Sequence, residues 1–529
     1  MYNRALLYLQ ERFLLDGLDL VRNFNLPAVR EEMIPRHADP RVIRDEMSYD
    51  QAALRQTLQT RIDSLNNKQK SFYDAVVHSV NNIEGRMFAL QASGGTGKTY
   101  TLNLLLDTFR SQGKIALATA LSGIAATLLN NGRTLHSRCK VPLKINKDSV
   151  CGFTQRDGTG KLLQRADILI IDEVGMGHKH VFEAIDRSLR FVRSVDAFFG
   201  GLTVVFATDW RQGLPVVRKG GRGQIVDACL KSSCIWRSVE LFTLDVNMRV
   251  LLNAEDNEFS EYLMRCGDGK LIIDESLGKF KVNVPNDLLF KSTLDDLIDW
   301  VYPNISDATH TDLRWTSRRA IICPTNATVD VVNHKTMKKF PGEEIVFRSY
   351  DSVETDSYAY PVEFLNTLMP SGLPPHKVIL KPGCPIMLMR NMDPHKGHCN
   401  GTKYVVTRLH TNIIEAEVSG GAFQGNRIFI PRIKMKPTDG TYPFELTRKQ
   451  FPVRPCFGIT SNKSQGQTLE RVGLYIDRPF FSHGQYYVGK SRVGAKSGLR
   501  ILVTDGVYQG KPGVWTDNVV YPEVLDLSD

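Results

Sequence analysis

The chain has 529 residues, enough for several domains, and it is 42% hydrophobic and 23% charged, a composition that excludes disordered and fibrous classes. No apolar run approaches membrane-spanning length, and the N-terminus lacks the long apolar core of a signal peptide. The formal net charge of +10 favours a polyanionic partner, although a merely basic surface is the alternative.

Residues 1–61 are predicted to form a helical, highly charged N-terminal segment. Apolar residues recur at helical spacing from Leu6 to Val21, which indicates one amphipathic helix. Pro27, Pro35 and Pro40 then interrupt the pattern. The segment is either an appendage or the remnant of a longer upstream chain.

Strand-like and helix-like segments alternate over residues 62–248, the pattern of a parallel α/β sheet. The run 168–171 is continuously apolar, as expected for a strand that is buried on both faces. Segment 138–163, rich in Gly, Lys and Asp, is predicted to be a loop or small hairpin inserted in this domain. The predicted strands are 87–90, 114–118, 168–171 and 202–207.

The most specific motif is the P-loop-like segment 92–99, which lies between a predicted strand and a predicted helix. Its glycines let backbone N–H groups surround phosphate oxygens at a helix N-terminus. Lys98 is expected to reach the β- and γ-phosphates, and the Thr99 hydroxyl to ligate Mg²⁺. The predicted nucleotide-binding residues are Gly94, Gly95, Thr96, Gly97, Lys98 and Thr99.

Two acidic residues, Asp172 and Glu173, end the buried strand 168–171. An acid at this place can hold Mg²⁺, and its neighbour can activate the attacking water. An acidic helix cap is the alternative, but the upstream P-loop favours nucleotide hydrolysis.

Gln212 follows the next buried strand, and Arg249 follows another strand-like run. A glutamine can position water or sense the γ-phosphate, and an arginine can neutralise charge on the transferring phosphate. A polar loop and an ordinary surface arginine are the alternatives.

The second half contains a clear strand at 320–323 and a final α/β unit with strands at 472–476 and 500–503. Between them, residues 381–454 carry several Gly and Pro residues and short β-like runs such as 404–406 and 413–414. This composition predicts a small β-barrel insertion.

Eight motifs, in one order along the chain, resemble those of superfamily-one DNA helicases. Besides the P-loop they are 65–69 (LNNKQ), 122–126 (SGIAA), 134–137 (TLHS), 172–176 (DEVGM), 209–212 (DWRQ), 462–468 (NKSQGQT) and 487–493 (YVGKSRV). Together they are similar to the petite-integration-frequency (PIF) branch. Segments 363–366 (EFLN), 371–376 (SGLPPH) and 397–402 (GHCNGT) resemble most the helicase part of Helitron transposons. The likeness runs from about residue 65 to residue 502.

This resemblance implies an α/β fold with two RecA-like P-loop NTPase domains. The first spans 62–248, and the second comprises 249–380 and 455–529, with 381–454 as an SH3-like barrel. It implies an ATP-dependent 5′-to-3′ DNA helicase that uses ATP and Mg²⁺, in repair, recombination, telomere maintenance or transposition. The implied partners are single-stranded DNA and duplex junctions, with no membrane and no small-molecule substrate besides ATP, and the implied state is a monomer.

The resemblance also assigns roles to residues. Gln69 would recognise adenine, Asp172 would hold Mg²⁺ and Glu173 would activate water. Gln212, Arg249 and Arg492 would close on the γ-phosphate. The residues implied to face single-stranded DNA or to couple it to ATP are Thr134, His136, Asn326, Lys463, Ser464 and Gln465. Candidate aromatic residues for base stacking are Phe153, Trp210, Tyr350 and Tyr487, with buried packing as the alternative.

Four departures from the family pattern stand out. Ala92 replaces the first P-loop glycine, Gly175 stands where serine is usual, and Ala207-Thr208 replace a glycine pair. Lys490 replaces an apolar residue close to Arg492. A degenerate, transposon-derived nucleic-acid-binding protein without productive unwinding is therefore the competing hypothesis. The nine cysteines form no CxxC pair, which predicts a reduced, intracellular chain, and the family likeness implies a nuclear one.

Overall fold

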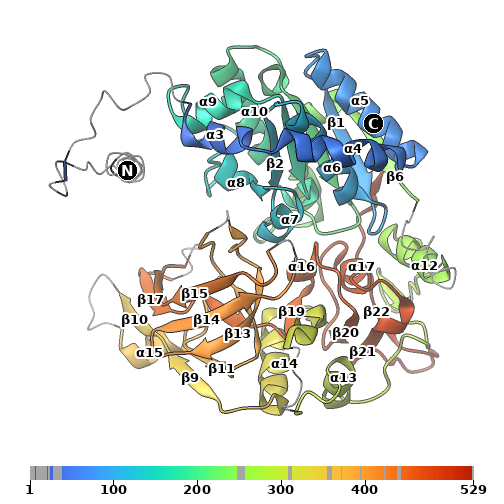
Figure 1. Ribbon diagram of the computed structural model, residues 1–529. Helices are drawn as coiled ribbons and strands as arrows, with labels where there is room; N and C mark the ends of the chain where they lie inside the picture. Colours follow the sequence, from blue (N-terminus) through green and yellow to red (C-terminus); the bar gives the residue numbers. More distant parts are fainter. Residues whose placement is uncertain are drawn as a thin grey trace.

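The computed structural model describes residues 39–246, 257–307, 313–353, 360–370, 372–393, 396–421, 423–437 and 442–526, together with residues 6, 21, 24, 26 and 27. Most of the helix expected between Leu6 and Val21 lies outside these residues, and so does Arg249. The described chain forms two lobes, the upper and the lower one in Figure 1.

The upper lobe, which we call the first lobe, is built on a six-stranded parallel sheet in the order β3-β2-β4-β5-β1-β6. Its strands are β1 (Met87–Ala92), β2 (Ala116–Ala120), β3 (Arg133–Thr134), β4 (Ile168–Asp172), β5 (Thr203–Thr208) and β6 (Val239–Leu244). Ile168 and Ile170 pack in one hydrophobic core, and Leu169 and Ile171 pack in the core on the other face. The strand is therefore buried on both faces, as its apolar run predicts.

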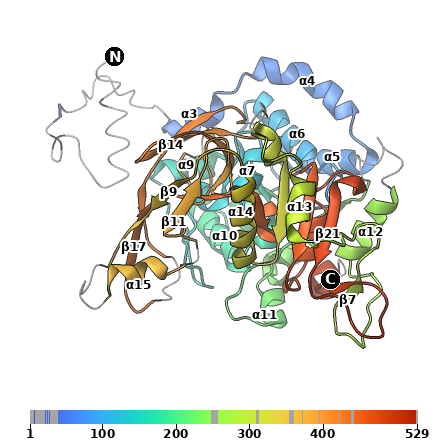
Figure 2. The same cartoon turned by 90° about the horizontal axis from the view of Figure 1, so that it is seen from below.

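Helices cover both faces of this sheet (Figures 1 and 2). They are α5 (Asn67–Asn81), α6 (Lys98–Ser111), α7 (Gly123–Leu128), α8 (Leu135–Arg138), α9 (Gly158–Arg165), α10 (Lys179–Arg193) and α11 (Arg222–Asp227), with 3-10 turns at η2 (Val174–Met176), η3 (Phe198–Gly201), η4 (Leu230–Ser232) and η5 (Cys234–Ser238). The inserted segment 138–163 forms no hairpin. It is irregular up to Asp157, whose carboxylate accepts a hydrogen bond from the Gly160 N–H and caps α9.

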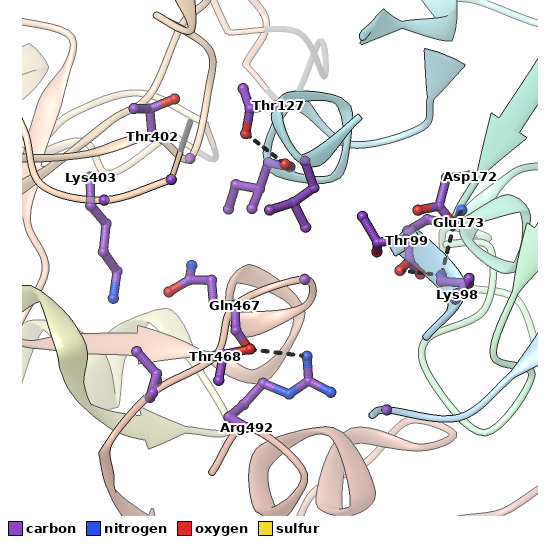
Figure 3. A pocket seen from close by; sticks show the side chains of 18 of the residues that line it. Lys98, Thr99, Thr127, Asp172, Glu173, Thr402, Lys403, Gln467, Thr468 and Arg492 are labelled. Atoms are coloured by element: carbon purple, nitrogen blue, oxygen red, sulfur yellow. Dashed lines mark hydrogen bonds and ion pairs between the residues drawn. The ribbon is translucent and has the colours of Figure 1, made fainter. Parts of the chain in front are cut away.

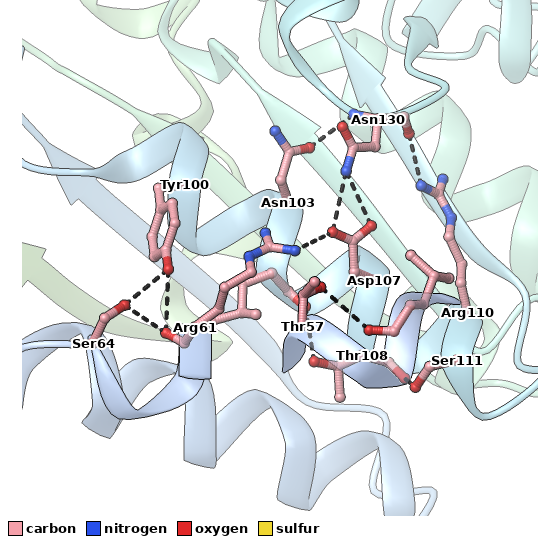
Figure 4. Close-up of polar contacts among 12 residues, drawn as sticks. Thr57, Arg61, Ser64, Tyr100, Asn103, Asp107, Thr108, Arg110, Ser111 and Asn130 are labelled. Atoms are coloured by element: carbon pink, nitrogen blue, oxygen red, sulfur yellow. Dashed lines mark hydrogen bonds and ion pairs between the residues drawn. The ribbon is translucent and has the colours of Figure 1, made fainter. Parts of the chain in front are cut away.

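The described part of the N-terminal segment forms α3 (Arg41–Met47) and α4 (Gln51–Asp63), which pack on the first lobe. Figure 4 shows the polar contacts that fasten α4 to α6. Arg61 donates to Asp107 Oδ2 at 2.7 Å, and Asn130 Nδ2 donates to Asp107 Oδ1 at 3.0 Å. Arg55 donates to the Ser111 carbonyl at the C-terminal end of α6. These helices therefore brace the helix that begins at Lys98.

The lower lobe, which we call the second lobe, contains a four-stranded parallel sheet in the order β19-β8-β20-β21. Its strands are β8 (Arg319–Cys323), β19 (Gly458–Thr460), β20 (Arg471–Ile476) and β21 (Leu499–Val503). Its helices are α12 (Asn257–Gly267), α13 (Leu294–Val301), α14 (Asn326–Lys339), α16 (Ser461–Ser464) and α17 (Gln485–Lys490), with 3-10 turns at η8 (Leu313–Arg318) and η10 (Lys496–Gly498).

A β-rich part separates β8 from β19 in the sequence. Its five-stranded antiparallel sheet, in the order β15-β14-β13-β12-β18, contains β12 (Pro385–Leu388), β13 (Lys403–Leu409), β14 (Ile413–Val418), β15 (Arg427–Pro431) and β18 (Val453–Pro455). A three-stranded antiparallel sheet, in the order β10-β17-β16, contains β10 (Tyr350–Val353), β16 (Ile433–Met435) and β17 (Leu446–Gln450). The remaining elements here are the β9 (Ile345–Arg348) and β11 (Lys377–Leu380) ribbon and α15 (Val362–Thr367).

The C-terminal segment crosses from one lobe to the other. β22 (Trp515–Asp517) pairs with β7 (Lys281–Asn283), and α18 (Pro522–Leu525) follows. Val519, Tyr521 and Val524 pack in the core of the first lobe. The sequence groups these residues with the second domain, but their apolar side chains are buried against the first lobe. Among the described residues, no helix combines the length and apolar character that crossing a bilayer requires.

Candidate functional site

The predicted site residues gather where parallel strands end. The P-loop follows β1, Asp172 ends β4, and 209–212 follows β5, so these segments meet at one edge of the first sheet. In the second lobe, Asn326 follows β8 and Ser464 follows β19, again at carboxyl ends. Open parallel sheets bind their ligands at this edge.

The P-loop has the backbone that its glycines predict. Gly95 and Gly97 have φ values of 90° and 85°, which other residues adopt only with strain. Gly97 precedes α6, so the helix N-terminus points at the loop. Ala92, which replaces a family glycine, is the last residue of β1 and is buried in the core, so its methyl group packs inside the lobe.

Lys98 is held by the two acids at the end of β4 (Figure 3). Its Nζ lies 2.7 Å from Asp172 Oδ1 and 3.0 Å from Glu173 Oε1, and all three side chains are largely buried. Burial lowers the pKa of Lys98, but the carboxylates outweigh this effect and raise its pKa above the usual value, so it remains an ammonium ion. Glu173 has a φ of 58°, a strained conformation of the kind that clusters at functional sites.

These residues line a cavity of about 700 Å³ between the two lobes. The P-loop, Thr99, Asp172, Glu173 and Gln212 form the first-lobe wall. Arg492 lies on the opposite wall, where it donates to the Val488 carbonyl at 2.9 Å and to Ser491 Oγ at 2.7 Å (Figure 3). The cavity therefore has a cluster of one lysine and two acids on one side and an arginine on the other.

Gln212 and Gln69 differ in how fully their side-chain amides are hydrogen-bonded. Gln212 donates to Asp209 Oδ2 at 3.2 Å, and its buried Oε1 has no hydrogen-bond partner among the described residues. Gln69 is buried beside the P-loop, where Nε2 donates to the Thr96 carbonyl at 3.0 Å and Oε1 accepts from the Asn66 N–H. A Cβ at Gly97 would lie 2.4 Å from Gln69 Nε2, so this glycine is required for the contact.

Segment 209–212 connects the lobes. Three bonds cross here: Tyr487 Oη donates to Asp209 Oδ2 at 3.0 Å, His483 Nε2 to the Trp210 carbonyl at 2.8 Å, and Arg211 Nε to Asp268 Oδ1 at 2.6 Å. The same segment carries Gln212 at the cavity, so these inter-lobe bonds lie next to that glutamine in the chain.

The residues implied to face DNA lie on both lobes. In the first, Thr134 caps α8 and His136 follows it, with a pKa that burial lowers. In the second, Asn326 accepts from Arg454, and Lys463 donates to Asn400 Oδ1 at 2.9 Å. Ser464 is bonded to the Ser461 carbonyl, and buried Gln465 has no hydrogen-bond partner for either amide atom among the described residues.

The candidate aromatic residues differ sharply in exposure. Phe153, Trp210 and Tyr487 are buried, so they pack inside the protein and offer no ring to a base. Tyr350 is 69% exposed and lies on β10, away from the cavity.

The sequence did not assign a role to the turn at 399–401, which the structure places against α7. A Cβ at Gly123 would lie 2.8 Å from Cys399 Cβ, and one at Gly401 would lie 2.9 Å from Ile124 Cδ1. The glycines of segment 397–402 indicate a tight turn, but a sequence pattern does not reveal that this turn packs against α7. The turn joins the β-rich part to the first lobe next to Lys463.

Two family models match separate parts of this chain. The family model for PIF1-like helicases matches residues 64–276, and the model for the 2B domain of DNA helicase Pif1 matches residues 363–409. The chain is 26% identical over 425 residues to the ATP-dependent DNA helicase PIF1 of Xenopus laevis and 27% identical over 440 residues to that of Homo sapiens. These matches cover 80% and 82% of this chain but only 60% of each relative's length.

A solved structure of Pif1 helicase from Bacteroides in complex with ADP-AlF3 and ssDNA superposes with a TM-score of 0.61 at 23% identity, and covers 86% of this chain and 94% of that one. Another, of two Pif1 helicases at forked dsDNA, gives a TM-score of 0.60 at 23% identity, and covers 83% and 92%. The two lobes are thus RecA-like α/β domains. The chain is therefore similar to PIF1-like helicases over most of its length.

Proposed function

We propose that this chain is an ATP-dependent DNA helicase that translocates 5′ to 3′ on single-stranded DNA and unwinds duplex. The observation that carries the proposal is the inter-lobe cavity, with Lys98, Asp172 and Glu173 on one wall and Arg492 on the other. The relatives named as ATP-dependent DNA helicases, and the similar structure bound to ADP-AlF3 and ssDNA, support it.

The P-loop residues would hold the nucleotide. The backbone of Gly94, Gly95, Thr96 and Gly97 would surround the β-phosphate, and Lys98 would exchange its carboxylate partners for phosphate oxygens. That exchange releases Glu173 to orient and deprotonate the attacking water. Gln69 would recognise adenine beside the P-loop, where its Nε2 lies 3.0 Å from the Thr96 carbonyl oxygen.

The donor set beside Lys98 fits a magnesium ion. The Asp172 carboxylate and the Thr99 hydroxyl are hard oxygen donors that line the same wall. Mg²⁺, when bound, would supply positive charge that offsets the charge on the phosphates. Thr99 and Asp172 would hold it there.

Closure of the lobes would couple hydrolysis to movement. Arg492 would approach the γ-phosphate from the second lobe, together with Gln212 and Arg249, and neutralise developing charge. Two lobes that open and close around a ligand can convert turnover into stepping. Single-stranded DNA would run across both lobes, past Thr134 and His136 on the first and Asn326, Lys463, Ser464 and Gln465 on the second.

The domain organisation and the biological context are also part of this proposal. The antiparallel sheet of β12, β13, β14, β15 and β18 supports an SH3-like insertion in the second RecA-like domain, predicted at 381–454, although β10 pairs with β17 across the first of these bounds. Helitron-like ancestry, a monomeric state and a nuclear location, in repair, recombination, telomere maintenance or transposition, are further parts that the family likeness suggests.

The test is ATP hydrolysis with and without single-stranded DNA. The wild type should show strong DNA stimulation, and Lys98→Ala should lose turnover. Lys161→Ala removes an exposed lysine from α9 of the same lobe and should behave as the wild type. Turnover by the wild type no faster than by Lys98→Ala, with DNA binding retained, would favour the nucleic-acid-binding protein without unwinding.

A further inference from the structure

One face of the three-stranded sheet β10-β17-β16 is exposed and basic. Tyr350 pairs with Lys449, and Lys449 pairs with Lys434, so the three side chains form one row across the sheet. All three are exposed. Their neighbours Asp351 and Arg448 point to the opposite face and are buried, as the two-residue period of a strand requires. We call the exposed row, with the cations next to it, the outer sheet face.

More cations surround this row. Arg348 and Lys377 pair with each other on the adjoining β9–β11 ribbon and are exposed. Arg432 lies over the Tyr350 ring, 5.8 Å from its centroid. Within the part of the chain that the structure describes, no ion pair with an acid is formed by Arg348, Lys377, Lys434 or Lys449.

The support beneath the face is fixed. The buried guanidinium of Arg448 donates to both Asp351 carboxylate oxygens, at 2.7–3.1 Å, and to the carbonyls of Pro374, Leu365 and Leu368. These bonds tie the C-terminal part of α15 and Pro374 to the sheet. The exposed row therefore stands on a rigid base, which lowers the entropy lost when a ligand binds.

The outer sheet face is separate from the inter-lobe cavity. None of its residues lines that cavity. Figures 1 and 2 both show β17 at the outer edge of the second lobe, and Figure 1 shows it away from α16 and α17.

We propose that the outer sheet face is a second binding site for single-stranded DNA, in which the cations contact phosphates and one unpaired base stacks on Tyr350. The inference rests on the proposed helicase function for the identity of the polyanion. Unopposed cations with an exposed ring are the combination that single strands use, because phosphates supply charge and every base has a π face. A duplex would leave the ring unused, since its base faces are stacked inside.

The experiment compares two lengths of oligo-dT by fluorescence anisotropy. An oligonucleotide of about 8 nucleotides fills one site, and one of about 30 can reach both. The variants are Tyr350→Ala and the triple variant Arg348→Ala, Lys434→Ala and Lys449→Ala. The matched controls are Tyr350→Phe, which keeps the ring, and Lys161→Ala, Lys291→Ala and Lys338→Ala together, which remove three exposed lysines elsewhere.

For the long oligonucleotide, Tyr350→Ala should weaken binding about five- to hundredfold. The triple variant should lower the slope of log affinity against log salt by about 2, from three lost phosphate contacts. Binding of the short oligonucleotide and the controls should match the wild type. Equal long-oligonucleotide affinity in wild type and variants, or an equal loss for both lengths, would overturn the proposal. Failure of the wild type itself to bind either length would instead overturn the proposed function.

Discussion

The hydroxyl of Thr208 accepts a hydrogen bond from the backbone N–H of Gly175 at 3.1 Å, and this bond joins the ends of two neighbouring strands. Both positions depart from the family pattern, in which serine and glycine stand at 175 and 208. A Cβ at Gly175 would lie 2.8 Å from Thr208 Oγ1, so the two positions cannot both carry a side chain without displacement. The two departures compensate each other.

We therefore expect Gly175→Ser to impair stability and ATP turnover, and Gly175→Ser with Thr208→Gly to restore them. A double-mutant cycle from urea unfolding should give a coupling free energy of about 0.5–3 kcal/mol, the range for residues in contact. Additive effects of the two substitutions would show that the positions are independent.

Arg492→Ala should lower DNA-stimulated ATP turnover by about 10³–10⁵-fold, the usual cost of removing an arginine that neutralises the transition state. Arg237→Ala, at an exposed position of the first lobe, should leave turnover unchanged. Steady-state rates at saturating ATP and DNA decide the matter. Near-normal turnover in Arg492→Ala would remove this residue from the proposed site.

His483 should make stability depend on pH. Its Nδ1 accepts from the Tyr521 N–H and its Nε2 donates to the Trp210 carbonyl, and burial lowers the pKa of His483 to about 4. Between about pH 6.5 and 4 the unfolded state binds a proton that the folded state does not, so the free energy of unfolding falls as pH falls, by up to about 3 kcal/mol. Thermal melting of His483→Asn should show a flatter pH dependence than the wild type, whereas exposed His334→Asn should not.

Asp351→Asn should destabilise the β-rich part, because it leaves the guanidinium of Arg448 buried without its charge partner. Both side chains are fully buried, and breaking such a pair costs about 3–5 kcal/mol. Glu445→Gln, which breaks the exposed pair with Lys436, should cost less than about 1 kcal/mol. Urea unfolding measures both, and equal costs would contradict this account.

Lys490 is fully buried, and its Nζ lies 3.7 Å from the centroid of the Tyr486 ring and 4.3 Å from that of Tyr262. Tyr486→Phe keeps the ring and should be nearly neutral. Tyr486→Leu removes the ring face from a desolvated ammonium and should cost about 2 kcal/mol or more. Equal unfolding free energies for the two variants would show that the ring does not stabilise Lys490.

Much of the fold could be predicted because its strands are buried and parallel. The runs at 87–90, 168–171 and 202–207 predict β1, β4 and β5, and the P-loop and the acids follow β1 and β4 by connectivity alone. The contact between Gly175 and Thr208 could not be predicted, because they lie 33 positions apart in the chain and each looks like an independent departure from the family pattern. The burial of Val519 and Tyr521 in the first lobe could not be predicted either, because an apolar side chain does not reveal which of two hydrophobic cores will bury it.

Some contacts of the candidate site could be predicted from the sequence, and others could not. Lys98, Asp172 and Glu173 were expected together, and the structure places them within 3.0 Å of one another through Lys98 Nζ. The contact of Lys463 with Asn400 has no periodic signal, because it joins a helix of the second lobe to a turn of the β-rich part.

The C-terminal segment returns from the second lobe to the first between Val503 and Val519, and the Arg222–Glu523 pair fastens α18 there. The C-terminal segment therefore limits how far the lobes can separate, because full separation would expose the apolar side chains of Val519, Tyr521 and Val524 to water.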